Sequence, residues 1–163
     1  MNAIVVVDEQ WGIGKNNSLL FRLKKDMAFF RETTTGKVIV VGANTYASFP
    51  NGALPNRLNI VLDDSGKKRP DAITVSSVEE LDKVLASYNT DDVFVCGGAS
   101  VYSLLLSRCK YVYVTKVAAN GSAQLFFPNL DKLQGWSLAE AGEPILDGEY
   151  QIQFCKYVNN TLM

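Results

Sequence analysis

The sequence predicts an α/β fold: a single domain with a mainly parallel twisted sheet, an antiparallel C-terminal edge and helices on both faces. Short, continuous apolar runs, such as residues 3–7 and 38–41, are typical of strands that are covered on both faces. Segments with helical periodicity alternate with these runs, which is the pattern of a parallel sheet. No repeat or linker divides the chain, so we expect residues 1–163 to form one domain.

The composition excludes several functional classes. A hydrophobic content of 47% with 20% charged residues is ordinary for a globular protein, and a net charge of -1 does not indicate nucleic-acid binding. The chain has no histidine, which removes Ser-His-Asp and Cys-His chemistry and histidine metal sites. Cys96, Cys109 and Cys155 are far apart and form no Cys-x-x-Cys pair, so no metal site or disulfide framework is predicted. No apolar run reaches the length of a bilayer span and no signal-peptide layout is visible, so we expect a cytoplasmic protein.

The first strand, residues 3–7, leads into a long connection. Residues 8–21 contain Gly12 and Gly14 and show no strong periodicity. Connections of this length inside a compact domain are often functional lids. We therefore expect a loop here that moves over a binding site.

A helix that begins at Leu23 carries the most informative residue, Asp26. Leu23, Met27 and Phe30 fall on one apolar face at i, i+4 and i+7. Asp26 lies at the edge of that face, where an ionised carboxylate is costly because desolvation disfavours the charged form. The residues alone leave two interpretations open: a solvated Asp paired with Lys25 or Arg22, or a carboxylate held in a dry cleft for a ligand with paired N–H donors.

The rest of the chain keeps the alternation of strands and helices. Ser77 and Glu80 form a predicted capping box for one helix, and a second helix follows Gly97-Gly98. Glycines between a strand and a helix can present backbone N–H groups to a phosphate, although a plain tight turn also uses two glycines. The remaining predicted strands are residues 38–41, 58–62, 72–75, 93–96, 111–115, 136–141 and 150–158, with the last two antiparallel and residues 144–148 between them.

Several candidate site residues follow directly after predicted strands. These are the lid, the Asp26 helix, Gly42, Gly97-Gly98 and Thr115. Ligands of such sheets bind at the carboxyl ends of the strands. This convergence indicates that Asp26 faces a binding site.

Seven collinear motifs also carry a family resemblance. They are Ile13-Gly14, Leu23-x-x-Asp26-Met27-x-x-Phe30, Gly42-x-x-Thr45-x-x-Ser48-Phe49-Pro50, Leu54-Pro55-x-Arg57-x-Asn59, Gly97-Gly98-x-x-Val101-Tyr102, Thr115 and Phe127-Pro128. In this order and spacing the chain resembles the dihydrofolate reductase family over essentially its whole length. The resemblance implies NADPH-dependent reduction of 7,8-dihydrofolate to 5,6,7,8-tetrahydrofolate for one-carbon and thymidylate metabolism. It also implies a monomer that binds antifolate-type inhibitors and neither nucleic acid nor membrane.

The resemblance assigns substrate contacts. Asp26 would bind the 2-amino group and a ring nitrogen of the pterin, and Thr115 would support this contact through its hydroxyl and a water. Arg57 would form a bidentate pair with the glutamate α-carboxylate of the substrate. Without the resemblance, a surface salt bridge is the simpler interpretation of Arg57. The other implied contacts are Ile4, Val5, Val6, Met27, Phe30, Phe49, Leu54, Cys96 and Tyr102, and Phe21 joins Asp26 and Thr115 as a catalytic position.

The resemblance also assigns the cofactor site. Ile13, Gly14 and Thr45 would line the nicotinamide and its linkage, and Gly97-Gly98, joined by a cis peptide bond, would meet the pyrophosphate. The full implied set is Val6, Ile13, Gly14, Asn17, Ser18, Leu19, Gly42, Ala43, Asn44, Thr45, Leu62, Asp63, Asp64, Cys96, Gly97, Gly98, Ala99, Ser100, Val101 and Tyr102.

The implied mechanism places few demands on side-chain chemistry. The nicotinamide supplies the hydride, so the protein positions it over pterin C6 and arranges protonation of N5. No side chain is an obvious direct proton donor to N5. The resemblance implies a water admitted by the lid, with Asp26 favouring protonation electrostatically. Orientation and a dry polar site would supply most of the rate enhancement.

Two departures from the family pattern affect the lid. Phe21 replaces the usual Trp and Leu20 the usual Pro, so an indole N–H that helps to order a water is missing. Gln124 and Leu125 replace the usual Asp-Thr. We therefore expect altered lid packing, and we expect a loop contact that helps to close the lid to be absent.

A larger departure concerns the 2′-phosphate of NADPH. The family usually places Arg at the position of Ala43, and often a basic residue at Asn44 or Ser100. Here Asp63-Asp64 also replaces Ser or Thr. The sequence predicts weak discrimination against NADH, or rescue by residues 67–69 folding back; by charge pattern alone this basic run is a solvated turn.

Two other functions compete with the folate interpretation. One is the reductase of riboflavin synthesis, which uses NADPH on a pyrimidine, and the other is a non-catalytic folate- or nucleotide-binding module. The spacing of Asp26 and Arg57 favours the folate substrate. Nothing needed for hydride transfer is visibly lost, which argues against the binding module.

Overall fold

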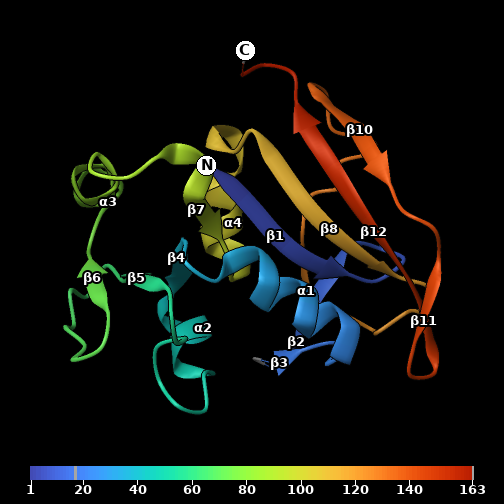
Figure 1. The fold of residues 1–163 in the computed structure, drawn as a ribbon, viewed down its shortest axis with the longest axis horizontal. Coiled ribbons are helices and arrows are strands. Elements are labelled where there is room, and N and C mark those ends of the chain that lie inside the picture. Colours follow the sequence, from blue (N-terminus) through green and yellow to red (C-terminus); the bar gives the residue numbers. More distant parts are fainter. Residues whose placement is uncertain (17, 163) are drawn as a thin grey trace.

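Nine strands form one mixed sheet in the computed structural model, which describes residues 1–16 and 18–162 (Figure 1). The strand order is β10-β12-β8-β1-β7-β4-β5-β6, and β11 pairs with β12. The strands from β8 to β6 in this order are parallel, whereas β10, β11 and β12 form an antiparallel edge. Their bounds are β1 Asn2–Val7, β4 Val38–Gly42, β5 Leu58–Leu62, β6 Ile73–Val75, β7 Val93–Val95, β8 Tyr111–Val117, β10 Trp136–Ala141, β11 Ile145–Asp147 and β12 Tyr150–Asn159.

Helices cover both faces of this sheet. On one face, Phe29 and Phe30 of α1 (Lys24–Thr34) pack in an apolar cluster with Ile4 and Phe94. The larger core lies on the other face. There α3 (Val78–Leu85) and α4 (Ala99–Leu105) pack through Leu81, Val101 and Leu105. The predicted fold class is therefore confirmed.

The remaining helical segments are short. Helix α2 (Ala43–Ala47) starts directly at the end of β4, and single 3-10 turns, η1 (Thr90–Asp92) and η2 (Leu106–Arg108), precede β7 and β8. The predicted cap of α3 is present, because the Ser77 side chain accepts a hydrogen bond from Glu80 N at 3.2 Å. The Glu80 carboxylate accepts from Ser76 N, one residue before the donor that a capping box predicts.

The predicted lid loop is wrong in its secondary structure. It contains β2 (Gly12–Lys15) and β3 (Ser18–Leu19), and β2 also pairs with β9 (Leu125–Phe126) in a separate three-stranded sheet. The glycine-rich strand β2 has no alternating pattern, and its second partner β9 lies more than 100 residues away, so no local signal reveals it. β11 was also unpredicted, because it is a three-residue strand that exists only through pairing with β12.

Within the residues described, none of the helices has the length and apolar character needed to cross a membrane.

Candidate active site

Asp26 and Thr115 meet at the carboxyl-end edge of the parallel strands. Asp26 lies in the first turn of α1 and is half-buried, and Thr115 near the end of β8 is 2% exposed. Burial raises the pKa of Asp26, the Thr115 hydroxyl opposes this, and the negative charge of Asp147 raises the pKa further. The Lys25 ammonium does not pair with Asp26, because it donates to the Leu146 carbonyl oxygen at 2.6 Å. Among the described residues Asp26 forms an ion pair with neither Lys25 nor Arg22, so the solvated-pair interpretation is wrong.

The surroundings of Asp26 are mostly apolar. Phe30, Leu54 and Cys96 pack with Ile4 in one cluster, and burial raises the pKa of the Cys96 thiol, which keeps it neutral. Met27 does not complete the predicted apolar face, since the residue is 52% exposed. Because Phe30 lies about one turn after Asp26 on α1, this cluster offers a hydrophobic wall with one carboxylate at its edge.

Tyr102 and the first strand connect this wall to the glycine loop. The buried Tyr102 hydroxyl donates to the Ile4 carbonyl oxygen at 2.7 Å, and burial raises its pKa well above the ordinary value. Side chains alternate along β1, so Ile4 faces the wall, whereas the Val5 side chain lies in the larger core on the opposite face. Only the backbone of Val5 can reach a ligand beside Ile4.

Arg57 is oriented by neutral groups. Its Nε donates to the Pro55 carbonyl oxygen at 2.9 Å, its Nη1 donates to Thr34 Oγ1 at 3.0 Å, and its guanidinium lies over the Phe30 ring. No ion pair with Arg57 exists among the residues that the structure describes, so the predicted surface salt bridge is wrong. The charge and the remaining N–H groups are available for an anion. Buried Asn59 holds the loop, since it exchanges hydrogen bonds with the backbone of Leu54.

Gly97 and Gly98 connect β7 to α4 through the expected cis peptide bond. The Gly97 carbonyl oxygen accepts from Gly42 N at 2.8 Å, which joins the ends of β4 and β7. A Cβ at Gly98 would come within 3.3 Å of Thr45 Oγ1, and one at Gly42 within 3.0 Å of Val101. These glycines therefore leave a backbone-lined space beside a hydroxyl, a donor set that fits the phosphates of a dinucleotide.

The other predicted cofactor positions flank this space or lie in the lid. Ala43 and Ala99 open α2 and α4 and are half-buried, and Asn44 and Ser100 beside them are exposed. In the lid, Ile13 is buried, while Ser18 and Leu19 are exposed; Leu62, Val6 and Phe49 are partly buried. Phe21 is buried and packs edge-on against Tyr150. Asn17 was also predicted and lies outside the described residues.

The lid is tied to the segment before Phe127, contrary to expectation. Gln124 N donates to the Gly14 carbonyl oxygen at 2.8 Å, and Gln124 Oε1 accepts from Asn16 N at 3.0 Å. Leu125 pairs with Gly14 in the ladder between β2 and β9. The expectation of a missing contact is wrong, because the longer Gln side chain offers the same kind of acceptor as Asp.

The root of the lid is fixed by a buried carboxylate that the sequence did not reveal. Asp8 is 3% exposed and accepts hydrogen bonds from the backbone N–H groups of Gln10, Gly12 and Gly121 at 2.7–2.9 Å. A Cβ at Gly12 would collide with this carboxylate and with Ala123, so only glycine fits there.

Asp63 and Asp64 follow β5, and the charge of Asp63 is neutralised by Arg69. Arg69 Nη2 lies 2.7 Å from the Asp63 carboxylate, with side-chain exposures of 10% and 11%. The Arg69 guanidinium also lies over the Tyr46 ring, and Tyr46 donates to Asp71. The Arg69 hydrogen bond lowers the pKa of Asp63. The prediction that residues 67–69 form a solvated turn is therefore wrong for Arg69. Lys67 and Lys68 are exposed, as is Asp64.

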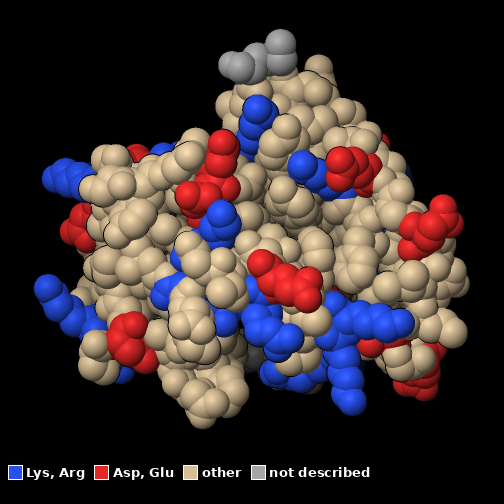
Figure 2. All heavy atoms as spheres, in the orientation of Figure 1, with Lys and Arg blue, Asp and Glu red and all other residues tan. Residues whose placement is uncertain are grey.

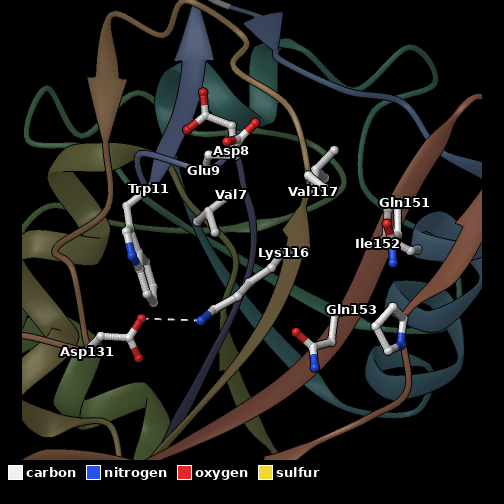
Figure 3. Close-up of a pocket in the computed structure, with 12 residues that line it drawn as sticks. Val7, Asp8, Glu9, Trp11, Lys116, Val117, Asp131, Gln151, Ile152 and Gln153 are labelled. Atoms are coloured by element: carbon white, nitrogen blue, oxygen red, sulfur yellow. Dashed lines mark hydrogen bonds and ion pairs between the residues drawn. The ribbon is translucent and has the colours of Figure 1, made fainter.

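One cavity lies apart from these residues. It measures about 370 Å³, opens beside the Lys116–Asp131 ion pair and Trp11, and contains none of the predicted site residues (Figure 3). The candidate site differs from this cavity in having a positively charged surface beside it. Lys and Arg side chains gather over the region of α1 (Figure 2), where Arg22, Lys24, Lys25 and Arg31 are exposed.

Comparisons with known proteins agree with this geometry. A family model described as dihydrofolate reductase matches residues 1–159. The chain is 29% identical to a dihydrofolate reductase of Schistosoma mansoni (96% of this chain, 95% of that protein) and 30% identical to one of Bacillus subtilis (94% and 91%). A solved dihydrofolate reductase from Enterococcus faecalis, complexed with NADP(H) and RAB-propyl, superimposes with a TM-score of 0.85 at 30% identity and covers 98% of this chain and 95% of that one. The chain therefore belongs to the dihydrofolate reductase family of NADPH-dependent oxidoreductases.

Proposed function

We propose that this chain reduces 7,8-dihydrofolate to 5,6,7,8-tetrahydrofolate with NADPH, at a site where Asp26 binds the pterin ring. The observation that carries the proposal is a half-buried carboxylate beside Thr115, at the edge of an apolar wall and without a basic partner among the described residues. A flat ring with adjacent N–H donors satisfies both features, since its faces contact Phe30 and Ile4 while its donors reach the carboxylate.

Asp26 has two tasks in this proposal. Its oxygens accept hydrogen bonds from the 2-amino group and ring nitrogen of the pterin, which fixes the orientation of the ring. Burial raises its pKa, so the site resists an uncompensated negative charge and favours an added proton on the bound substrate. The proton itself reaches N5 from a water, because no described side chain is assigned as its direct donor.

Arg57 accounts for the glutamate tail of the substrate. Its guanidinium is held by the Pro55 carbonyl oxygen and the Thr34 hydroxyl, so its orientation is fixed before binding. The planar fork suits a carboxylate in two-point contact. The basic side chains over α1 would attract the same anionic tail (Figure 2).

The cofactor site is supported by the glycines after β4 and β7. When bound, NADPH supplies the hydride. The backbone of Gly97 and Gly98 and the Thr45 hydroxyl would hold its phosphates, and the buried Tyr102 hydroxyl fixes the Ile4 carbonyl oxygen beside the reacting rings. The lid strands β2 and β3 would cover the site and exclude water.

Replacing Asp26 tests the proposal. The Asp26→Asn variant is expected to lose about 100-fold or more in kcat at neutral pH, the usual scale for losing a group that assists proton transfer. The measurement is the loss of NADPH absorbance with dihydrofolate. Glu32→Gln removes an exposed carboxylate from the same helix and is the matched control, expected to keep full activity. An Asp26→Asn variant as active as the parent would contradict the assignment.

In this proposal the preference between NADPH and NADH depends on the ion pair of Asp63 and Arg69. Asp63 alone would repel the 2′-phosphate of NADPH, but Arg69 neutralises it and keeps further N–H groups for an anion. We infer that Arg69 takes the place of the arginine that the family has at Ala43. This supports NADPH as the main cofactor, with NADH as a weaker alternative.

We also propose a compartment and an oligomeric state for the protein. All three cysteines are free thiols, which is typical of a reducing compartment such as the cytoplasm. We also propose that residues 1–163 act as a single monomeric domain. Antifolate-type inhibitors would compete with dihydrofolate for Asp26.

A further inference from the structure

The helix that carries Asp26 is capped by a distant residue. Helix α1 starts at Lys24, and its N-cap Leu23 has no side chain that can accept a hydrogen bond. Backbone N–H groups in the first turn of a helix need acceptors from outside the helix. Here Asp147 Oδ2 of β11 accepts from Lys25 N at 2.8 Å and from Asp26 N at 3.2 Å.

The contact is part of a built interface between α1 and the β11–β12 hairpin. Asp147 is 4% exposed, and the Lys25 ammonium donates to the neighbouring Leu146 carbonyl oxygen at 2.6 Å. Below these bonds, Leu23 packs in a small apolar cluster with Phe21 and Ile152. The start of α1 is thereby fixed to the hairpin by two hydrogen bonds from its backbone N–H groups to the Asp147 carboxylate, by the hydrogen bond of the Lys25 ammonium and by the apolar contact of Leu23.

The cap also places charge next to the pterin-binding carboxylate. Asp147 bonds to the backbone of Asp26 itself, and its charge raises the pKa of the Asp26 side chain. The Thr115 hydroxyl from β8 also bonds to Asp26, and the Tyr102 hydroxyl from α4 lies close enough for its charge to interact with Asp26, but burial keeps Tyr102 neutral. Asp147 is thus the second negative charge at the site.

We propose that Asp147 is a positioning residue for the reaction, because it fixes the first turn of α1 and sets a like charge beside Asp26. The inference rests on the proposed function, in which Asp26 binds the pterin. A second carboxylate disfavours further negative charge nearby and so favours the state in which the Asp26–pterin pair holds an extra proton. The cap and the charge are separate contributions of one side chain.

Neutral caps separate these contributions. Asp147→Asn and Asp147→Ser keep an oxygen that can accept from the first turn, and both residue types are favoured N-caps, but they remove the charge. Asp147→Ala removes cap and charge together. Glu149→Gln removes an exposed carboxylate two residues away in the same hairpin and is the matched control.

The experiment measures the protonation of Asp26 in two ways. One is the ¹³C NMR titration of the Asp26 carboxyl carbon, assigned with Asp26→Asn; the other is the pH profile of kcat. Both neutral caps are expected to titrate at lower pH than the parent, and kcat on the alkaline side is expected to fall about threefold or more, since fewer sites stay protonated. Asp147→Ala is expected to show the same shift with a lower Tm and a higher KM for dihydrofolate. Glu149→Gln should match the parent in every measurement.

Two outcomes would overturn the inference. Titrations of both neutral caps that coincide with the parent would show that the charge has no effect at Asp26. A shift to higher pH would contradict the sign. Neither result touches the proposed function, which fails only if Asp26→Asn itself keeps full activity.

Discussion

Arg69 changes how the neighbouring Asp63 would act on a bound cofactor. Asp63 alone indicates repulsion of a phosphate or binding of a ribose hydroxyl, as in NAD-dependent enzymes. With Arg69 bonded to it at 2.7 Å and stacked over Tyr46, the same carboxylate becomes a support for a cation. The effect of this part of the site on a phosphate therefore depends on the combined charge of Asp63 and Arg69, and not on either residue alone.

The role of Arg69 is testable by comparing the two cofactors. Arg69→Gln is expected to raise KM for NADPH relative to KM for NADH by about fivefold or more, because unpaired Asp63 would then repel the additional phosphate. Steady-state kinetics with each cofactor measures this ratio. Lys68→Gln, an exposed cation in the same run, is the control and should change the ratio little. A strong NADPH preference that persists in Arg69→Gln would refute the assignment.

At the scale of elements, the lid is a strand pair completed by a third strand from a distant segment. β2 lies between β3 and β9, and Gln124 adds a backbone and a side-chain bond at the turn. These bonds cross from residues 14–16 to residues 124–125, so the position of the lid depends on both segments.

Gln124 offers a matched pair of variants for this element. Gln124→Ala removes the acceptor of the Asn16 N–H group and is expected to slow hydride transfer about twofold to tenfold, as for the loss of one hydrogen bond. Gln124→Glu retains an acceptor oxygen and should stay close to the parent. Single-turnover kinetics separates hydride transfer from product release. Equal rates for all three proteins would show that the bond does not hold the lid closed.

For the whole molecule, the ionised Asp26 carboxylate lowers the stability of the folded state. Burial raises the pKa of Asp26 above its ordinary value of 3.8, so the folded state binds this proton more tightly than the unfolded state. Stability from this group is therefore full below pH 3.8 and is lost as pH rises through the raised pKa.

Asp26→Asn should consequently be more stable than the parent at neutral pH although it is less active. The gain in Tm is expected to shrink as pH falls toward 3.8, where the parent carboxyl is also neutral. Thermal unfolding of both proteins across this range is the measurement. A gain that did not change with pH would show that repacking, and not ionisation, causes it.

Much of the fold and site could be predicted from local sequence. Continuous apolar runs identified the buried strands because burial on both faces leaves no alternation, and Ser77 marked its helix through a local cap. Asp26, Thr115 and Gly97-Gly98 could be placed because parallel strands bring their carboxyl ends to one edge. These signals need only a few neighbouring residues.

The features that could not be predicted depend on long-range partners. β2, β9 and β11 exist through pairing, and Asp147 acts on a helix more than 100 residues away. Asp8 likewise looks like an ordinary turn residue until Gly121 is placed beside it. The charge of Arg69 was visible, but only the structure shows that it lies on Asp63.

The Asp8 carboxylate has one more consequence. It gathers three backbone N–H groups from two segments, so any swing of the lid has to pivot beyond Gly12 while the base stays still. Amide hydrogens of Gly12 and Gly121 should then be among the slowest in this region to exchange with deuterated solvent, and they should remain slow whichever ligand is bound.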